Sequence, residues 1–213
     1  MAKPIVYGPA YSTYARTVRL ALEEKGVDYD LVEVDLLAGA AKASEHLARH
    51  PFGKVPAFEH DGFELYETDA IVRYVNAAFP GPDLEPADVK SRARMAQAIN
   101  VIGGYAYPCM IGQIFIQRAV MPMMGNTADE AAVAAALPQA RTSVAALEDL
   151  LDGNAYLAGD RLSLADLFLI PVYDYASQTP EGEKLLADAP NLRRWWDGVR
   201  TRASVAKTRP SFG

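Results

Sequence analysis

The first residues of this chain that could do chemistry are polar side chains at the expected ends of secondary-structure elements. Ser12 follows a short apolar run, Lys3–Tyr7, and a turn at Gly8-Pro9, and it precedes a segment with helical periodicity. A serine in that place commonly caps the helix. It could also donate a hydrogen bond to the sulfur of a bound thiol, whose ionised form is favoured by the positive end of a helix. Both roles are open for Ser12.

Two further positions have features of a peptide-binding site. Val55-Pro56 precedes an expected strand; a cis bond there would turn the Val55 backbone toward an extended peptide, although most X–Pro bonds are trans. Glu67-Thr68 stands where a strand ends and a helix begins. A helix cap beside an acid is ordinary in that place, but a helix end can also hold a carboxylate while Glu67 holds an ammonium group. Those two groups together form the amino-acid end of a ligand.

The elements that must position these residues alternate over residues 3–80. Short apolar runs predict strands and helical periods predict helices, in the order strand, helix, strand, helix, strand, strand, helix. The two consecutive strands, Val55–Glu59 and Phe63–Tyr66, flank a tight turn and predict a hairpin. The first crossover requires parallel pairing and the hairpin antiparallel pairing, so we expect a small mixed sheet with helices on its faces.

A stretch rich in proline and glycine, residues 81–87, predicts a linker between two domains. Residues 1–80 would form the α/β domain, and residues 88–213 have only helical patterns, over 88–120, 128–152, 163–177 and 191–203. The fold class is therefore an α/β domain followed by an all-α domain. The last 23 residues carry six basic side chains, which we interpret as a solvated last helix whose cations suit the helix dipole.

Composition excludes several classes of protein. Half of the 213 residues are hydrophobic, which is enough for a core, and a net charge of −6 argues against a general nucleic-acid binder. The single cysteine, Cys109, excludes an internal disulfide and a CxxC pair, and we expect it to be buried and unreactive. The three histidines lack metal-ligand spacing, so no metal is expected. Because no apolar targeting segment opens the chain and Val101–Gly112 is short for a membrane span, we expect a cytoplasmic protein.

Taken together and in this order, the motifs resemble the cytosolic glutathione transferases. The likeness lies in PIVYGPAYSTYARTVRLALEEKGVDYDLVEVDL, HPFGKVPAFEHDGFELYETDAIVRYV, YLAGDRLSLADLFLIP with its SLAD capping box, and RTRASVAKTRP. It covers essentially the whole chain. The resemblance implies a thioredoxin-like domain that binds glutathione, an all-helical domain, and a cytoplasmic detoxification enzyme that is usually a homodimer, with no nucleic-acid or membrane partner.

Within that family the chain is most similar to the serine-type, phi-like bacterial members. Positions 8–16 contain no cysteine, unlike the cysteine-type members, and counting back from Leu22 without gaps places Ser12 at the serine position of the family. The resemblance implies that the Ser12 hydroxyl stabilises the glutathione thiolate. Tyr11 and Tyr7 are the second choices for that role. From the residues alone, Tyr7 is equally a buried aromatic at a strand end, and Tyr11 an aromatic of a pocket wall.

The resemblance also implies a set of residues that bind glutathione, namely Lys42, Lys54, Val55, Pro56, Glu67 and Thr68. The backbone of Val55, before a family cis-proline at Pro56, would pair with the cysteinyl unit. Glu67 and Thr68 would bind the γ-glutamyl ammonium and carboxylate, and the two lysines are candidates for the glycyl carboxylate. The chain departs from the family pattern at His50, where asparagine is usual, and at Thr68, which keeps the hydroxyl of the usual serine.

The implied activity is conjugation of the glutathione thiolate to small hydrophobic electrophiles, with glutathione peroxidase as a side activity. Residues 101–124 are apolar and aromatic, and we expect most of them to be helix core and some to contact the electrophile. The expected hydrophobic substrate site consists of Tyr11, Tyr105, Tyr107, Ile111 and Phe115. The alternatives are glutathione-dependent ether cleavage or isomerisation, and a non-catalytic scaffold that binds partners. A scaffold has no chemical need for the four motif residues Ser12, Pro56, Glu67 and Thr68.

Overall fold

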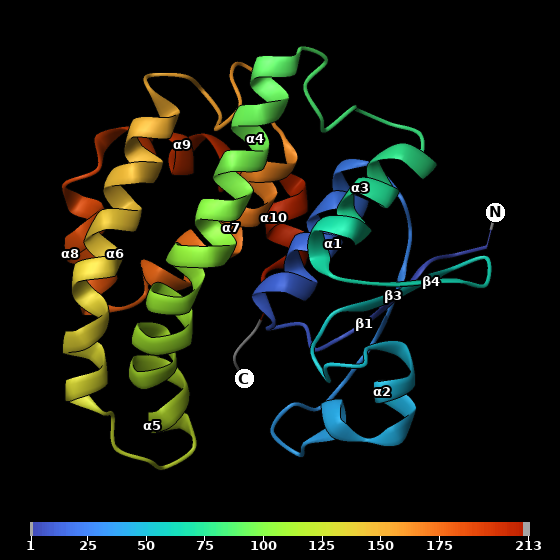
Figure 1. Cartoon of the computed structure of the whole chain (residues 1–213), viewed down its shortest axis with the longest axis horizontal. Helices are drawn as coiled ribbons and strands as arrows, with labels where there is room; N and C mark the ends of the chain where they lie inside the picture. The colour runs from blue at the N-terminus through green and yellow to red at the C-terminus, as the bar shows by residue number, and fades with distance from the viewer. Residues whose placement is uncertain (1, 211–213) are drawn as a thin grey trace. The chain divides into compact units, whose positions relative to one another are not determined.

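The structure is a computed structural model, and it describes residues 2–210 (Figure 1). The chain forms two compact units: one contains the residues up to Leu84 together with those from Thr201 onward, and the other is Glu85–Arg200. The first boundary lies inside the expected linker, residues 81–87. The second boundary differs from the expected helical domain of 88–213, because the last helix packs with the first unit.

The first unit is built on a four-stranded mixed sheet in the order β2-β1-β3-β4. β1 (Ile5–Tyr7) pairs in parallel with β2 (Asp30–Val32) and antiparallel with β3 (Ala57–His60). β3 forms a hairpin with β4 (Phe63–Tyr66). The predicted mixed sheet and its thioredoxin-like order of elements are confirmed.

Helices cover both faces of this sheet. α1 (Thr13–Glu24) and α3 (Thr68–Ala78) lie on one face, and α2 (Ser44–Arg49), preceded by the short helix η1 (Ala40–Lys42), lies on the other (Figure 1). Because successive strand residues point to opposite faces, the fully buried Val6 at the centre of β1 packs beneath α1 and α3. Its two neighbours in β1 face α2.

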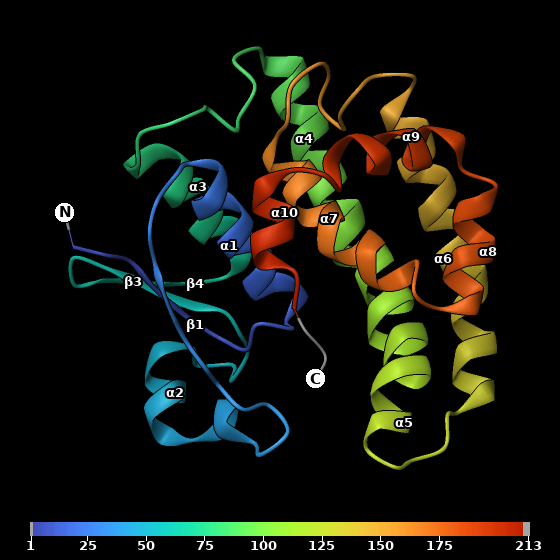
Figure 2. The ribbon, with the colours of Figure 1, turned by 180° about the vertical axis from the view of Figure 1, so that it is seen from behind.

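The last described helix, α10 (Ala203–Thr208), packs against α1 (Figure 2). Just before it, Arg202 donates hydrogen bonds of 2.8 and 2.7 Å to the two carboxylate oxygens of Glu24. Lys207 pairs with Glu23 at 3.0 Å. Five of the six basic residues are exposed, as expected for a solvated end, but Arg202 is half-buried, and it and Lys207 pair with the acidic end of α1.

The Glu24 carboxylate makes a pH-dependent contribution to stability. Burial opposes its ionisation, but hydrogen bonds from Arg202 and Ser204 hold the pKa of Glu24 below its ordinary value of 4.5. A carboxyl group whose pKa is lower in the folded state stabilises the protein above the unfolded pKa and loses that contribution as the pH falls through the folded pKa. The wild-type free energy of unfolding should therefore decline below about pH 4.5.

We expect Glu24→Gln to be less stable than the wild type by roughly 1–2 kcal/mol near neutral pH and to lose less stability in acid. Urea unfolding at a series of pH values measures both effects. Glu23→Gln is the matched control, because its partner Lys207 is mostly exposed, and it should change stability by less than about 0.5 kcal/mol. Equal pH dependence in wild type and Glu24→Gln would contradict this account.

The second unit is built of helices. They are α4 (Val89–Val101), η2 (Ile102–Val120), α5 (Met121–Met123), α6 (Glu130–Leu151), α7 (Leu164–Ala176), α8 (Pro180–Ala187) and α9 (Pro190–Val199). The first three run on continuously, and η2 has the wider hydrogen bonding of a π-helix, which the sequence did not predict. The continuous run Val89–Met123 is long and apolar enough to cross a membrane, judged by length and composition alone. Core helices of proteins outside membranes can have the same length and composition. In this run, 44% of the most apolar window is buried inside the protein.

The core of the second unit contains a buried carboxylate. Ser163 caps α7 through the predicted capping box with Asp166, which is fully buried. The Asp166 carboxylate also accepts hydrogen bonds from the Leu157 backbone N–H at 3.0 Å and from the Trp195 indole N–H at 2.8 Å. One side chain therefore joins the loop before α7, the start of α7 and α9.

Candidate active site

The three polar motifs meet at one end of the sheet. Tyr7, the last residue of β1, lies opposite Ala57, the first residue of β3, and Ala57 lies opposite Tyr66, the last residue of β4. The segments that continue from these three positions carry the serine, the X–Pro bond and the acid–threonine pair. Contact is direct at Gly8, where an added Cβ would lie 3.3 Å from the Val55 Cβ. The fold thus gathers motifs that are 55 residues apart in the chain.

Ser12 is half-buried and forms the N-cap of α1. Its Oγ accepts a 3.3 Å hydrogen bond from the Ala15 backbone N–H. A hydroxyl that accepts in this way still has its own hydrogen to donate, so capping and donation to a ligand are compatible. The first turn of α1 contains no acidic residue, so nothing in that turn opposes the positive potential of the helix end.

The Val55–Pro56 peptide bond is cis, as the resemblance implied. Within residues 2–210, no hydrogen bond engages the N–H or the C=O of Val55. The preceding loop is anchored, because the Lys54 carbonyl lies 2.7 Å from Nε2 of the buried His46 in α2. Val55 therefore has a backbone donor and acceptor available to an extended ligand, next to the turn that carries Ser12.

Glu67 and Thr68 occupy the junction of β4 and α3. Glu67 has φ 71° and ψ 117°, a conformation that non-glycine residues adopt rarely and that tends to occur at functional sites. Its side chain is exposed, whereas Thr68 is buried at the first position of α3. No side chain within the described residues caps this helix. The junction therefore offers a carboxylate, a hydroxyl and helix-end N–H groups together.

The two candidate lysines differ in their surroundings. The Lys42 ammonium donates a 3.1 Å hydrogen bond to the Phe52 carbonyl. It packs against Gly53, where an added Cβ would lie 2.9 Å from Nζ. Lys54 is exposed beside Val55. Both lysines are exposed, and Lys42 also holds the loop in place through the Phe52 carbonyl.

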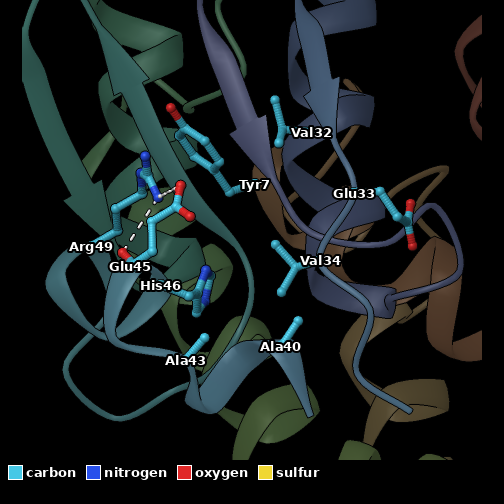
Figure 3. Close-up of a pocket in the computed structure, with 9 residues that line it drawn as sticks. All are labelled: Tyr7, Val32, Glu33, Val34, Ala40, Ala43, Glu45, His46 and Arg49. Carbon is cyan, nitrogen blue, oxygen red and sulfur yellow. Dashed lines mark hydrogen bonds and ion pairs between the residues drawn. The ribbon is translucent and has the colours of Figure 1, made fainter. Parts of the chain in front are cut away.

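Tyr7 faces α2, away from α1. Its ring helps to line a pocket of about 150 Å³ between the sheet and α2 (Figure 3). The Tyr7 hydroxyl donates a 2.9 Å hydrogen bond to Glu59, and the Arg49 guanidinium lies 4.4 Å from the ring centroid. Arg49 is held in turn by Glu45 at 3.2 Å. Burial and the Glu59 carboxylate raise the pKa of Tyr7, so this hydroxyl is already engaged.

Tyr11 is half-buried beside the acidic segment that follows β2. Burial and the carboxylates of Glu33 and Asp35 raise the pKa of the Tyr11 hydroxyl. A neighbouring thiolate would meet the same negative charges. Of the three candidate hydroxyls, Ser12 has the surroundings that best suit an anion.

His50 lies beside the end of β4, close enough to the Glu67 junction to feel its charge. It is buried, and its ring centroid lies 4.9 Å from that of Tyr66, at the end of β4. Burial lowers the pKa of His50 despite the opposing charge of Glu67, so the ring is neutral at pH 7. The only signal in the sequence was its place before Pro-Phe-Gly, where asparagine is usual in the family.

The residues of the second unit that were expected to contact the electrophile all lie on η2, but they differ in their exposure to solvent. Tyr105 is 58% exposed and Tyr107 is half-buried. Ile111 and Phe115 are buried in the helical core, where the Phe115 ring stacks on Tyr175 at 4.8 Å. Only the two tyrosines are accessible to a substrate.

Cys109 lies on the same helix and is buried, as expected. Its Sγ donates to the Tyr105 carbonyl at 3.0 Å, and burial raises the pKa of the thiol. These surroundings are those of a structural cysteine. Among residues 2–210, no group of three histidine, cysteine or acidic side chains is arranged to hold a metal ion.

Comparison with known proteins identifies the family. Residues 3–77 match the model of the glutathione S-transferase N-terminal domain, and residues 99–203 match that of the C-terminal domain. Glutathione S-transferase 1 of Zea mays is 34% identical over 207 residues, which are 97% of this chain and 96% of that protein.

Solved structures agree with this match. Glutathione transferase F7 from Populus trichocarpa superposes with a TM-score of 0.87 and 32% identity, covering 96% of this chain and 97% of that one. Glutathione S-transferase I from mais, in complex with an atrazine glutathione conjugate, gives a TM-score of 0.84 and 32% identity over 97% and 96% of the two chains. The chain belongs to the glutathione S-transferase family.

Proposed function

We propose that this protein is a glutathione transferase that joins the glutathione sulfur to small hydrophobic electrophiles. The observation that carries the proposal is the meeting of Ser12, Val55 and the Glu67-Thr68 junction at one end of the sheet. These groups match the parts of glutathione: a thiol, a peptide backbone and an amino-acid end. A relative crystallised with a glutathione conjugate supports the same chemistry.

Each part of glutathione has a partner in this arrangement. The Val55 N–H and C=O pair with the backbone of the cysteinyl unit, as one strand pairs with another. Glu67 holds the γ-glutamyl ammonium, and Thr68 with the N-terminus of α3 holds its carboxylate. The exposed Lys54 and Lys42 attract the glycyl carboxylate, although Lys42 also bonds the Phe52 carbonyl.

The reaction begins when the thiol of bound glutathione loses its proton to water. The thiolate sulfur then attacks an electrophilic carbon, a sulfur–carbon bond forms, and the leaving group departs with the electron pair of its bond. Ser12 donates a hydrogen bond to the sulfur, and the N-terminus of α1 lowers the pKa of the thiol. Ser12 is a hydrogen-bond donor here and accepts no proton.

We further infer that the protein is a serine-type, phi-like bacterial member; the position of Ser12 and relatives named in the F series of plant glutathione S-transferases support the serine-type, phi-like part. Tyr11, Tyr105 and Tyr107 have accessible rings to contact the electrophile, whereas Ile111 and Phe115 support η2 from the core. The family resemblance further implies a homodimer in the cytoplasm.

Retention on glutathione resin and conjugation of glutathione to a chloronitroarene test the function. We expect the wild type to bind the resin, elute with free glutathione and catalyse conjugation. Thr68→Val keeps the shape of the side chain but removes its hydroxyl, so it should raise the KM for glutathione roughly tenfold. A wild-type protein that flows through the resin and has no conjugating activity would instead indicate a scaffold.

A further inference from the structure

Arg19 is a buried cation in the middle of α1. Its side chain is bonded at three nitrogens: Nε to the Tyr29 hydroxyl at 3.1 Å, Nη1 to the Ala10 carbonyl at 3.2 Å and the Thr208 carbonyl at 3.4 Å, and Nη2 to the Lys207 carbonyl at 3.5 Å. The whole residue is 8% exposed. Three separate segments, namely the turn before α1, the residue Tyr29 and the end of α10, therefore share one guanidinium group.

The partners of Arg19 distinguish it from an ordinary ion pair. Within residues 2–210, no carboxylate is bonded to Arg19; its acceptors are three carbonyls and a hydroxyl. Burying a guanidinium is unfavourable unless its donors are satisfied, and an apolar residue of similar size would pack α1 without that penalty. The planar fork of arginine is suited to holding several acceptors in a fixed arrangement.

One of these acceptors belongs to the turn that presents Ser12. Ala10 stands two residues before Ser12, and the turn is closed by a 3.0 Å hydrogen bond from the Ser12 N–H to the Pro9 carbonyl. Helical side chains point back toward the helix N-terminus, which brings the Arg19 guanidinium to this turn. The same nitrogen bonds the end of α10, so the turn is tied to the C-terminal helix.

We propose that Arg19 is a positioning residue for the Ser12 hydroxyl: the guanidinium holds the turn through the Ala10 carbonyl, and the carbonyls of α10 hold the guanidinium. The inference rests on the proposed role of Ser12. Arg19 is hydrogen-bonded to Tyr29, Ala10, Lys207 and Thr208 and not to Val55, Glu67 or Thr68, so glutathione binding should persist without it. Its removal should instead misplace the hydroxyl, raise the pKa of the bound thiol and lower kcat.

The test compares Arg19→Leu and Arg19→Lys with Arg202→Met in the full chain. Arg202→Met is the matched control, because it removes the ion pair between the α10 segment and Glu24 but leaves the Arg19 bonds in place. The pKa of the thiol of bound glutathione is read from the ultraviolet absorbance of the thiolate, and kcat, KM and unfolding are measured in parallel.

We expect Arg19→Leu to raise the pKa of the bound thiol by about one unit and to lower kcat about tenfold, with KM for glutathione changed less than about twofold. Arg19→Lys should give an intermediate pKa, since its ammonium can still donate to the Ala10 carbonyl. Arg202→Met should lower stability and leave the pKa of the thiol unchanged.

A wild-type thiol pKa and kcat in Arg19→Leu, whatever its stability, would overturn the inference. If Arg19→Leu does not fold, Arg19→Lys is the variant that tests the proposal. A wild-type pKa of the bound glutathione thiol in Arg19→Lys then counts against it. Ser12→Ala distinguishes a failure of the proposed role of Arg19 from a failure of the proposed role of Ser12. If it raises the pKa of the thiol while the Arg19 variants do not, only the role of Arg19 fails; if it leaves the pKa unchanged, the proposed role of Ser12 fails.

Discussion

Ser12→Ala is expected to lower kcat/KM for glutathione conjugation about a hundredfold and to raise the pKa of the bound thiol. The alanine removes the Ser12 hydroxyl, which lies at the N-terminus of α1 and has its own hydrogen free to donate. It leaves Val55, Glu67 and Thr68 in place, so retention on glutathione resin should persist. Steady-state kinetics and ultraviolet titration of the bound thiol measure the two effects.

The alanine variant also loses the helix cap, which by itself costs about 1 kcal/mol of stability. Ser12→Gly separates the two roles, because glycine caps a helix to within a few tenths of a kcal/mol of serine but has no hydroxyl. We expect Ser12→Gly to be as inactive as Ser12→Ala, and Ser12→Thr to keep most of the activity. Full activity in Ser12→Ala combined with loss in Tyr11→Phe would assign the role to the tyrosine.

Asp166→Ala is expected to lower the free energy of unfolding by about 3 kcal/mol or more. The substitution leaves buried donors of Leu157, Ser163 and Trp195 without their acceptor. It also opens a void where the loop before α7 meets α7 and α9. Guanidinium unfolding followed by tryptophan fluorescence measures the change, since Trp195 reports directly on this region.

The matched control for Asp166 is the exposed Asp160 in the same loop. Asp160→Ala should change stability by less than about 0.5 kcal/mol, as is usual for surface substitutions. Asp166→Asn should lose less stability than Asp166→Ala and more than Asp160→Ala, because its amide oxygen can still accept some of the hydrogen bonds. A loss below about 1 kcal/mol in Asp166→Ala would show that this carboxylate does not hold the loop and the two helices together.

The order of elements in the first unit could be predicted because each signal is local. The apolar strand β1, the cap at Ser12 and the turn between β3 and β4 each depend on a few neighbouring residues. α8 was missed although Thr179 caps it and Pro180 stands at its first position, because the helix is only eight residues long. The assignment of α10 to the first unit depends on ion pairs between residues that are 178 or more positions apart in the sequence. No local sequence pattern indicates such pairs.

The motifs of the candidate site could be predicted from the sequence, but the residue whose hydroxyl is proposed to face the glutathione thiol could not. Spacing indicated Ser12, Val55 and Glu67, yet the sequence could not distinguish Ser12 from Tyr7. That distinction required the register of β1, which points Tyr7 toward α2 and Glu59. Arg19 did leave a signal, since it is a cation among the apolar residues of α1 that the helical period places inside. Its acceptors, however, come from tertiary structure alone.

The most direct test of the central claim is a crystal structure of the protein with glutathione bound. We expect the glutathione sulfur within about 3.2 Å of Ser12 Oγ, with the cysteinyl backbone paired to Val55 and the γ-glutamyl end at Glu67 and Thr68. A sulfur bonded to the hydroxyl of Tyr11 or Tyr7, with Ser12 acting only as the cap of α1, would contradict it.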